Sequence, residues 1–160
     1  MKHFKLTTES KINFLGKTLF RIEAIIDFKS IKKGQKGGWI EKEDNLSGNA
    51  WVSGNAEVFG DAWVSGDAEV SGNAEVSGNA RVFGDAVCTS LAMTLNFCWN
   101  LTLTDNHINY GCVQKTIKEW IEWLKGDEEF ETSRNSKKFK LIEMALNIAI
   151  EYRKQNPIKS

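Results

Sequence analysis

A six-residue repeat runs from Leu46 to Val87 and constrains the fold of this 160-residue chain more than any other feature. Each repeat reads as an aliphatic residue, Ser or Phe, Gly, Asn or Asp, Ala, and a variable residue. A period of six with one aliphatic position matches neither an α-helix nor an isolated strand, whose patterns recur about every 3.6 and two residues. The period therefore predicts a stack of short, similar units.

The residue types predict how each unit is built. Ala and the aliphatic residue two positions later point to the same side of an extended segment, and the variable residue between them points to the other. Gly followed by Asn or Asp tolerates the positive φ and the local hydrogen bonds of a corner. Three strands and three corners close a turn of about 18 residues, and strands of successive turns pair in parallel. The aliphatic positions are Ile40, Leu46, Val52, Val58, Val64, Val70, Val76 and Val82.

The flanking segments supply candidates to cover the open ends of this array. We expect a strand over 18–28, with the glycines at 34, 37 and 38 marking a bend. Residues 101–104 and 108–110, separated by Asp105, Asn106 and His107, predict a hairpin. Together these segments would protect both open edges.

After Cys112 the apolar pattern changes to a helical period. Thr116 and Glu119 form a capping box, and Gly126 ends the helix that follows. A second helix is expected from about Ser136 to Gln155, with two adjacent apolar faces that indicate burial on two sides. One face carries Phe139, Ile142, Leu146 and Ala149, and the other carries Leu141, Ala145, Ile148 and Tyr152.

Four regions follow from these patterns: an N-terminal β cap over 1–39, the repeat array over 40–93, a β-hairpin over 94–112 and a helical region over 113–160. The formal net charge is zero, but residues 1–40 hold nine Lys or Arg against three acids, whereas 41–112 hold two against ten. The three cysteines lack the paired spacings of a zinc site or a disulfide framework, and the N-terminus lacks an apolar signal core. We expect a cytoplasmic protein without a membrane segment.

The repeats resemble the hexapeptide-repeat family of left-handed β-helices. The stretch from Gly37 to Ser47, which leads directly into Gly-Asn-Ala repeats, is similar to uncharacterised hexapeptide-repeat proteins carried by phages and prophages. The segments 21–24, 110–112 and 116–120 extend that resemblance. It implies a mainly β chain: a left-handed parallel β-helix of about four coils, with an N-terminal strand cap and a C-terminal β-hairpin plus two α-helices. It also implies a homotrimer.

Many members of that family are acyltransferases, in which a histidine beside the coils serves as general base. Here His3 precedes the array and His107 lies in the expected hairpin turn, so the sequence predicts no catalytic residue, no cofactor and no metal site. Asp61, Asp67 and Asp85 occupy corner positions that Asn fills in other repeats, which explains them without calcium. A degenerate acyltransferase is kept as the alternative.

Function is therefore expected at the outward positions. Stacking of every third repeat places Trp51, Glu69 and Val87 on one face together with Phe83; an acidic second face carries Glu57 and Glu75, and the third carries Trp63, Arg81 and Phe59. Aromatic residues in this number are expected to be covered, either by the C-terminal helices or a neighbouring subunit, or by a partner that they bind. The predicted interface residues are Trp51, Phe59, Trp63, Arg81, Phe83 and Val87.

These observations predict a non-enzymatic binding or scaffold protein. Because the resemblance is to phage-borne proteins, the expected partner is a host protein or ribonucleoprotein, such as a CRISPR-type defence nuclease complex, which the chain would inhibit or sequester. The basic N-terminal segment has no interleaved aromatic residues, so direct nucleic-acid binding is not expected. A purely structural trimeric scaffold is a further alternative.

Overall fold

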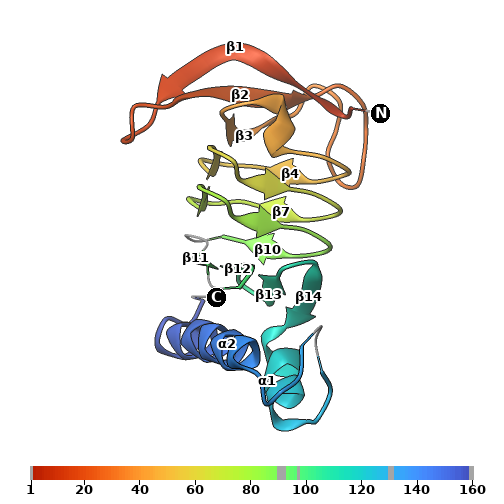
Figure 1. Cartoon of the computed structure of the whole chain (residues 1–160). Coiled ribbons are helices and arrows are strands. Elements are labelled where there is room, and N and C mark those ends of the chain that lie inside the picture. The colour runs from red at the N-terminus through yellow and green to blue at the C-terminus, as the bar shows by residue number, and fades with distance from the viewer. Residues whose placement is uncertain (1, 90–92, 97, 130–131, 159–160) are drawn as a thin grey trace.

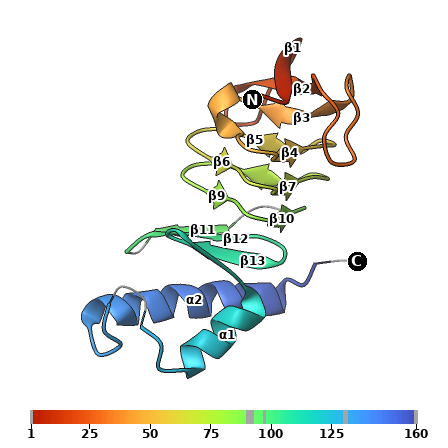
Figure 2. The same ribbon diagram turned by 90° about the vertical axis from the view of Figure 1, so that its right-hand side faces the viewer.

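A computed structural model describes residues 2–89, 93–96, 98–129 and 132–158. The chain is mainly β, with two α-helices at its C-terminal end (Figure 1). Short strands are stacked along the long axis of the molecule, the N-terminal strands lie at one end, and the helices lie at the other (Figures 1 and 2).

The N-terminal region forms an antiparallel sheet that continues into the repeats. Strands β1 (Phe4–Ile12), β2 (Thr18–Ala24) and β3 (Lys36–Ile40) pair in that order, and β3 then pairs in parallel with the repeat strand β5 (Glu57–Val58). The strand expected over 18–28 ends at Ala24, and β1 was not predicted because its residues are mostly polar.

Of the three glycines predicted to mark a bend before the array, only Gly34 lies in a turn. Gly34 has a positive φ and lies in a turn, as expected. Gly37 and Gly38 lie within β3, where a Cβ on Gly37 would come 2.5 Å from the carbonyl oxygen of Val52. Close approach of two backbones, rather than a bend, therefore requires glycine at position 37.

The repeats form three parallel ladders in which each strand pairs with the strand three repeats later. Strands β4 (Trp51–Val52), β7 (Glu69–Val70) and β10 (Val87–Cys88) form the first, and β3, β5 and β8 (Glu75–Val76) form the second. Strands β6 (Trp63–Val64) and β9 (Arg81–Val82) form the third, which the single bridge from Leu46 to Val64 extends. A short 3₁₀ turn, η1 (Glu43–Asn45), precedes Leu46.

Side chains within the repeats point as the sequence predicts. The Ala residues and the aliphatic residues that follow them are buried in all three ladders, while the residues between them are exposed or partly covered, except for Trp51, which is buried. Every repeat glycine has a φ between +61° and +69°, which L-residues with a Cβ rarely adopt. The predicted corners are therefore confirmed. The corner glycines are Gly48, Gly54, Gly60, Gly66, Gly72, Gly78 and Gly84.

The expected hairpin is the centre of a larger sheet. Strands β12 (Asn100–Leu103) and β13 (His107–Tyr110) pair as predicted, and β11 (Met93–Asn96) and β14 (Val113–Thr116) flank them in an antiparallel order β11-β12-β13-β14. The outer strands were missed because β11 lacks a clear alternation and β14 precedes the helix without a break. Two strands alone would be only marginally stable.

Helices α1 (Ile117–Lys125) and α2 (Lys137–Gln155) pack below this sheet (Figure 2). The capping box is confirmed: Thr116 Oγ1 accepts from the Glu119 backbone N–H, and the Glu119 carboxylate accepts from the Thr116 backbone N–H at 2.7 Å. Ser136 caps α2. The expectation that α2 is buried on two sides is wrong, because Leu141, Ile148 and Tyr152 remain exposed while the face carrying Phe139 is buried.

Two hydrophobic cores result. The ladder core contains the Ala and Val residues of the repeats together with Ile22, Ile40 and Trp51. The C-terminal core contains larger side chains from the last sheet and both helices, including Tyr110, Trp120 and Trp123.

Polar side chains of the last sheet close the open edge of the ladders. They satisfy backbone groups that have no further strand to pair with. Thr102 Oγ1 accepts from the Arg81 N–H at 2.9 Å, and Asn109 Nδ2 donates to the Arg81 carbonyl at 2.9 Å. The side chains of Asn106 and Asp105 likewise accept from the backbone N–H groups of Val87 and Thr89. The side-chain amides of Asn100 and Gln114 donate to the carbonyls of Asn79 and Phe83.

The uneven charge of the sequence is resolved by ion pairs between the basic N-terminal segment and the acidic repeats. Lys11 lies 2.7 Å from Glu57, and Lys29 lies 3.6 Å from Asp67 and 3.8 Å from Glu69. These ion pairs join β1 and the loop between β2 and β3 to the repeats. Neither helix of the described residues has the length and apolar content needed to cross a membrane.

A candidate binding groove beside the third ladder

The six residues predicted for an interface do not lie together. Trp51 is only 4% exposed, since His3 and Phe28 cover it, with ring centroids 6.5 and 5.5 Å from its own. Phe59 is buried as well. The assignment of Trp51 and Phe59 to an interface is therefore corrected: the N-terminal segment folds over the first of them, and both belong to the interior.

Trp63 and Arg81 remain at the surface and are neighbours. They are paired residues of β6 and β9, which confirms the predicted stacking of every third repeat. Trp63 is 39% exposed, although large aromatic side chains are usually covered. Arg81 is also exposed, and among the residues that the structure describes none forms an ion pair with its guanidinium. The pair offers an aromatic face beside an available positive charge.

A groove of about 390 Å³ opens at this pair. Phe83 lies in it rather than on the first face, because it follows β9 directly and turns toward the last sheet. The groove is lined by Trp63, Ser65, Arg81, Phe83, Gly84, Gly111 and Cys112. Its walls therefore come from the third ladder and from the turn between β13 and β14.

The walls of the groove are held in place by the closing hydrogen bonds. Arg81 is fixed through its backbone by Thr102 and Asn109, and Gln114 Nε2 donates to the carbonyl of Phe83. Gly111 has a φ of +60°, which lets the β13–β14 turn place the exposed free thiol of Cys112 at the rim. The side chain of Arg81 is thus left to interact with a ligand.

The residue before this turn lies in the C-terminal core. Tyr110 is fully buried, and its hydroxyl has no hydrogen-bond partner among the described residues. Burial raises the pKa of Tyr110 to about 12, and the nearby Cys98 adds to that rise. Tyr110 therefore stays neutral at physiological pH, within the C-terminal core.

The remaining predicted residues lie elsewhere. Val87 is partly buried in β10, and its N–H donates to Asn106 Oδ1 at 2.9 Å. Glu57 and Glu75 are paired in the second ladder as predicted, but Lys11 neutralises Glu57, and Glu75 accepts from Ser77 Oγ. The acidic face is therefore partly compensated within the chain.

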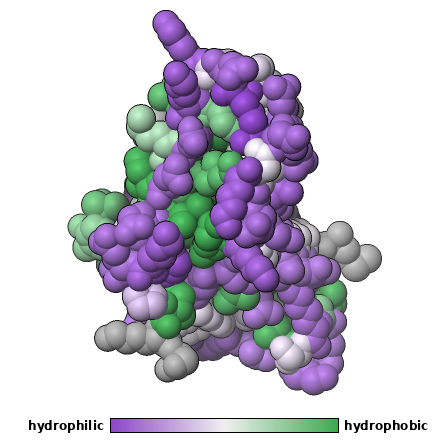
Figure 3. Space-filling view, turned by 90° about the horizontal axis from the view of Figure 1, so that it is seen from below, coloured by the Kyte–Doolittle hydropathy of each residue, from purple (hydrophilic) through white to green (hydrophobic). Residues whose placement is uncertain are grey.

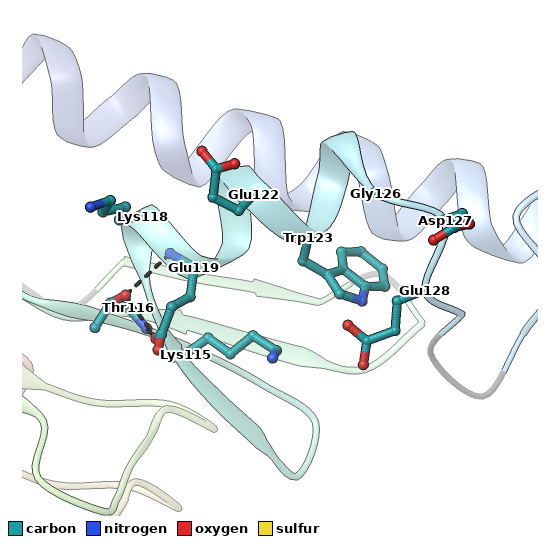
Figure 4. Close-up of a pocket in the computed structure, with 9 residues that line it drawn as sticks. All are labelled: Lys115, Thr116, Lys118, Glu119, Glu122, Trp123, Gly126, Asp127 and Glu128. Atoms are coloured by element: carbon teal, nitrogen blue, oxygen red, sulfur yellow. Dashed lines mark hydrogen bonds between the residues drawn. The ribbon is translucent and has the colours of Figure 1, made fainter.

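A second, larger hollow of about 620 Å³ lies beside α1 (Figure 4). Two of its charged groups already serve the local structure: Glu119 completes the capping box and Glu122 pairs with Lys125 at 3.1 Å. The hydrogen bonds from the Thr116 side chain and backbone hold the pKa of Glu119 below its usual value. Trp123 is largely buried, and Arg134 covers its ring at 4.9 Å. The hollow thus offers less to a ligand than the groove.

The two histidines are separated along the molecule. His3 Nε2 lies 2.9 Å from the Ala50 carbonyl in the N-terminal region, and His107 Nε2 lies 3.5 Å from Asp85 near the last sheet. Among the described residues, no group of three or more His, Cys, Asp or Glu side chains is arranged to hold a metal ion.

Sequence reasoning found Trp63, Arg81 and Phe83 but missed the opposite wall of the groove. Cys112 and Gly111 belong to a turn whose contact with the repeats depends on how the last sheet docks. A Tyr-Gly-Cys sequence between two short strands marks the turn, but it does not indicate what the turn faces. The chain matches no protein-family model, and a search of curated proteins found no match.

Proposed function

We propose that the chain is a non-enzymatic binding protein in which a left-handed parallel β-helix of about four coils presents the groove at Trp63 and Arg81 to a partner. The parallel pairing of every third repeat and the positive-φ glycine corners support this scaffold. The observation that carries the function is the exposed pair itself, an indole beside a guanidinium with no ion pair among the described residues.

The chemistry of the groove indicates the kind of surface it binds. Trp and Arg are the residues that most often dominate the binding energy of protein interfaces. The guanidinium of Arg81 suits a carboxylate, and the adjoining Trp63 and Phe83 suit an aliphatic or aromatic side chain. The expected ligand is therefore a protein segment in which an acidic residue adjoins an apolar one.

The resemblance of the repeats to phage-borne proteins supports a host protein as that partner. On this proposal the chain inhibits or sequesters a host factor, and a CRISPR-type defence nuclease complex is the kind of factor we expect. A protein-binding groove also suits the neutral net charge of the chain, because a general nucleic-acid-binding surface would require an excess of positive charge.

Capture of a host protein by tagged chain, with three variants, tests the proposal. Trp63→Ser and Arg81→Glu each remove one side chain of the pair, and each is expected to reduce capture about 30-fold or more, as a central interface residue would. Phe14→Ser is the matched control, since Phe14 is an exposed aromatic residue on the distant β1–β2 turn. Capture that survives both groove variants would place the binding surface elsewhere.

The acyltransferase alternative makes a different prediction. A degenerate enzyme of that class would still bind acyl-coenzyme A, so a saturable rise in melting temperature with that ligand would favour the enzyme. The binding proposal expects no such rise. The homotrimer that the resemblance implies stays a prediction, and the mass measured by light scattering separates it from a monomer or a dimer.

A further inference from the structure

Helix α2 carries a second apolar stripe that its own chain leaves uncovered. Leu141, Met144, Ile148 and Tyr152 are between 39% and 51% exposed and recur at intervals of three and four residues. That spacing places them along one side of the helix, away from the face that packs into the C-terminal core. Seen from below, the molecule shows hydrophobic side chains gathered across the end where α1 and α2 lie (Figure 3).

The stripe is self-complementary when two copies of α2 run antiparallel. A two-fold axis through the point midway between Met144 and Ile148 brings Met144 of one copy to the height of Ile148 of the other. The same axis brings Leu141 to within one residue of Tyr152, a difference of about 1.5 Å along the helix. All four exposed apolar side chains then meet apolar side chains, as an isologous interface requires.

The charges beside the stripe fit the same arrangement. Lys140 and Glu151 flank it on one side, and the antiparallel axis brings Lys140 of each copy to within one residue of Glu151 of the other. A parallel pair would keep them about 16 Å apart along the axis, because eleven residues separate them. Glu151 also contacts Lys154 and Gln155 of its own helix, and its carboxylate is 57% exposed.

We propose that α2 forms a homodimer interface in which two copies pack antiparallel through Leu141, Met144, Ile148 and Tyr152, with Lys140 facing Glu151 of the other copy. The interface is independent of the groove, which lies on the other side of the last sheet, beside the third ladder. Stable interfaces bury about 800 Å² on each partner, and one helix face supplies only part of that area. We therefore expect a dissociation constant on the order of 10 μM.

Sedimentation of the full chain over a range of concentrations tests this proposal. The expected result is a reversible increase from 18.0 kDa to twice that mass. Ile148→Asp should weaken the dimer at least 30-fold, because it places a charge at the centre of the stripe. Lys140→Glu and Glu151→Lys should each weaken it several-fold, and the double variant should restore it.

Glu143→Lys is the matched control, since Glu143 is exposed on the same helix but lies off the stripe. It should leave the dimer unchanged, and circular dichroism should show the same helix content in all variants. A chain that is monomeric at 100 μM or trimeric at all concentrations would overturn the proposal. A dimer that resists Ile148→Asp would also overturn it.

Discussion

The ladder core and the C-terminal core achieve burial in opposite ways. The ladders use small side chains, Ala and Val, repeated at each turn, and depend on many similar backbone contacts between strands of only two residues. The C-terminal core uses few but large side chains, including Trp120, Trp123 and Tyr110, packed between one sheet and two helices. The ladders therefore depend mainly on backbone contacts, and the C-terminal core depends mainly on the packing of large side chains.

This difference shows where each region is most sensitive. A repeat accommodates different outward residues, whereas a Cβ on Gly48, Gly54, Gly60 or Gly66 would come within 3.3 Å of the backbone of the next turn. The C-terminal core has ordinary backbone geometry and depends on how single large side chains fit. We therefore expect side-chain truncation to be most damaging in the C-terminal core and backbone strain to be most damaging in the ladders.

The largest expected effect is at Trp120, which is fully buried and donates its Nε1–H to the Ile108 carbonyl at 2.8 Å. Trp120→Ala should lower the free energy of unfolding by about 3–5 kcal/mol. Val70→Ala, at a fully buried ladder position, should cost about 2 kcal/mol, because it removes less volume. Chemical denaturation measures both, and equal costs would contradict the contrast between the cores.

Two corner glycines provide a matched pair for the ladders. Gly66 and Gly78 have similar φ values, +69° and +61°. A Cβ on Gly66 would lie 2.9 Å from the Gly84 backbone nitrogen, whereas one on Gly78 meets nothing within 4 Å. Gly78→Ala should therefore cost about 1–2 kcal/mol from the left-handed conformation alone, and Gly66→Ala about 3 kcal/mol in total.

Thermal unfolding of the two variants measures that difference. Equal melting temperatures would show that the turns separate easily to admit a methyl group, and the close packing of successive corners would then not limit the sequence.

High pH should affect the C-terminal core through Tyr110. Its ordinary pKa of about 10 applies to the unfolded chain, and the pKa is raised to about 12 in the fold. Below pH 10 the tyrosine is neutral in both states, and between pH 10 and 12 the unfolded state loses its proton first, so stability falls. The loss attributable to Tyr110 should reach about 2–3 kcal/mol by pH 12.

Tyr110→Phe isolates this contribution from other groups that titrate at high pH. The difference in unfolding free energy between wild type and Tyr110→Phe should be constant below pH 10 and should shift in favour of the variant above it. A difference that does not change with pH would show that the tyrosinate is accommodated in the fold.

The smallest expected effect is at the start of α1. Thr116→Ala removes the hydroxyl that accepts from the Glu119 N–H and should cost about 1 kcal/mol. Thr116→Ser keeps that hydroxyl and serves as control. If both variants lose the same stability by thermal unfolding, the capping box contributes little to the C-terminal core.

The sequence predicted the repeats more completely than it predicted the rest of the chain. Within the repeats, one period determines the strand positions, the corners and the pairing of every third repeat, so Trp63 and Arg81 could be paired without a structure. The outward aromatics were harder to interpret, because the sequence does not show that His3 and Phe28 cover Trp51.

Outside the repeats, local signals predicted elements but not their neighbours. The structure confirms both predicted helix starts, at the capping box of Thr116 and at the cap of Ser136. The second apolar face of α2 was visible in the sequence, but its exposure was not. That exposure, the number of strands in the last sheet and the position of Cys112 at the groove depend on contacts between segments far apart in the chain. Such contacts leave no periodic pattern in a single sequence.

The way the last sheet closes the ladders has a consequence for how such a chain can change its length. Thr102, Asn106 and Asn109 bind backbone atoms, which every turn presents alike, rather than the side chains of one particular repeat. One further block of three repeats inserted before Gly78 would meet the same cap. The array then acts as an adjustable spacer, in which each added block moves the two ends apart by about 4.8 Å.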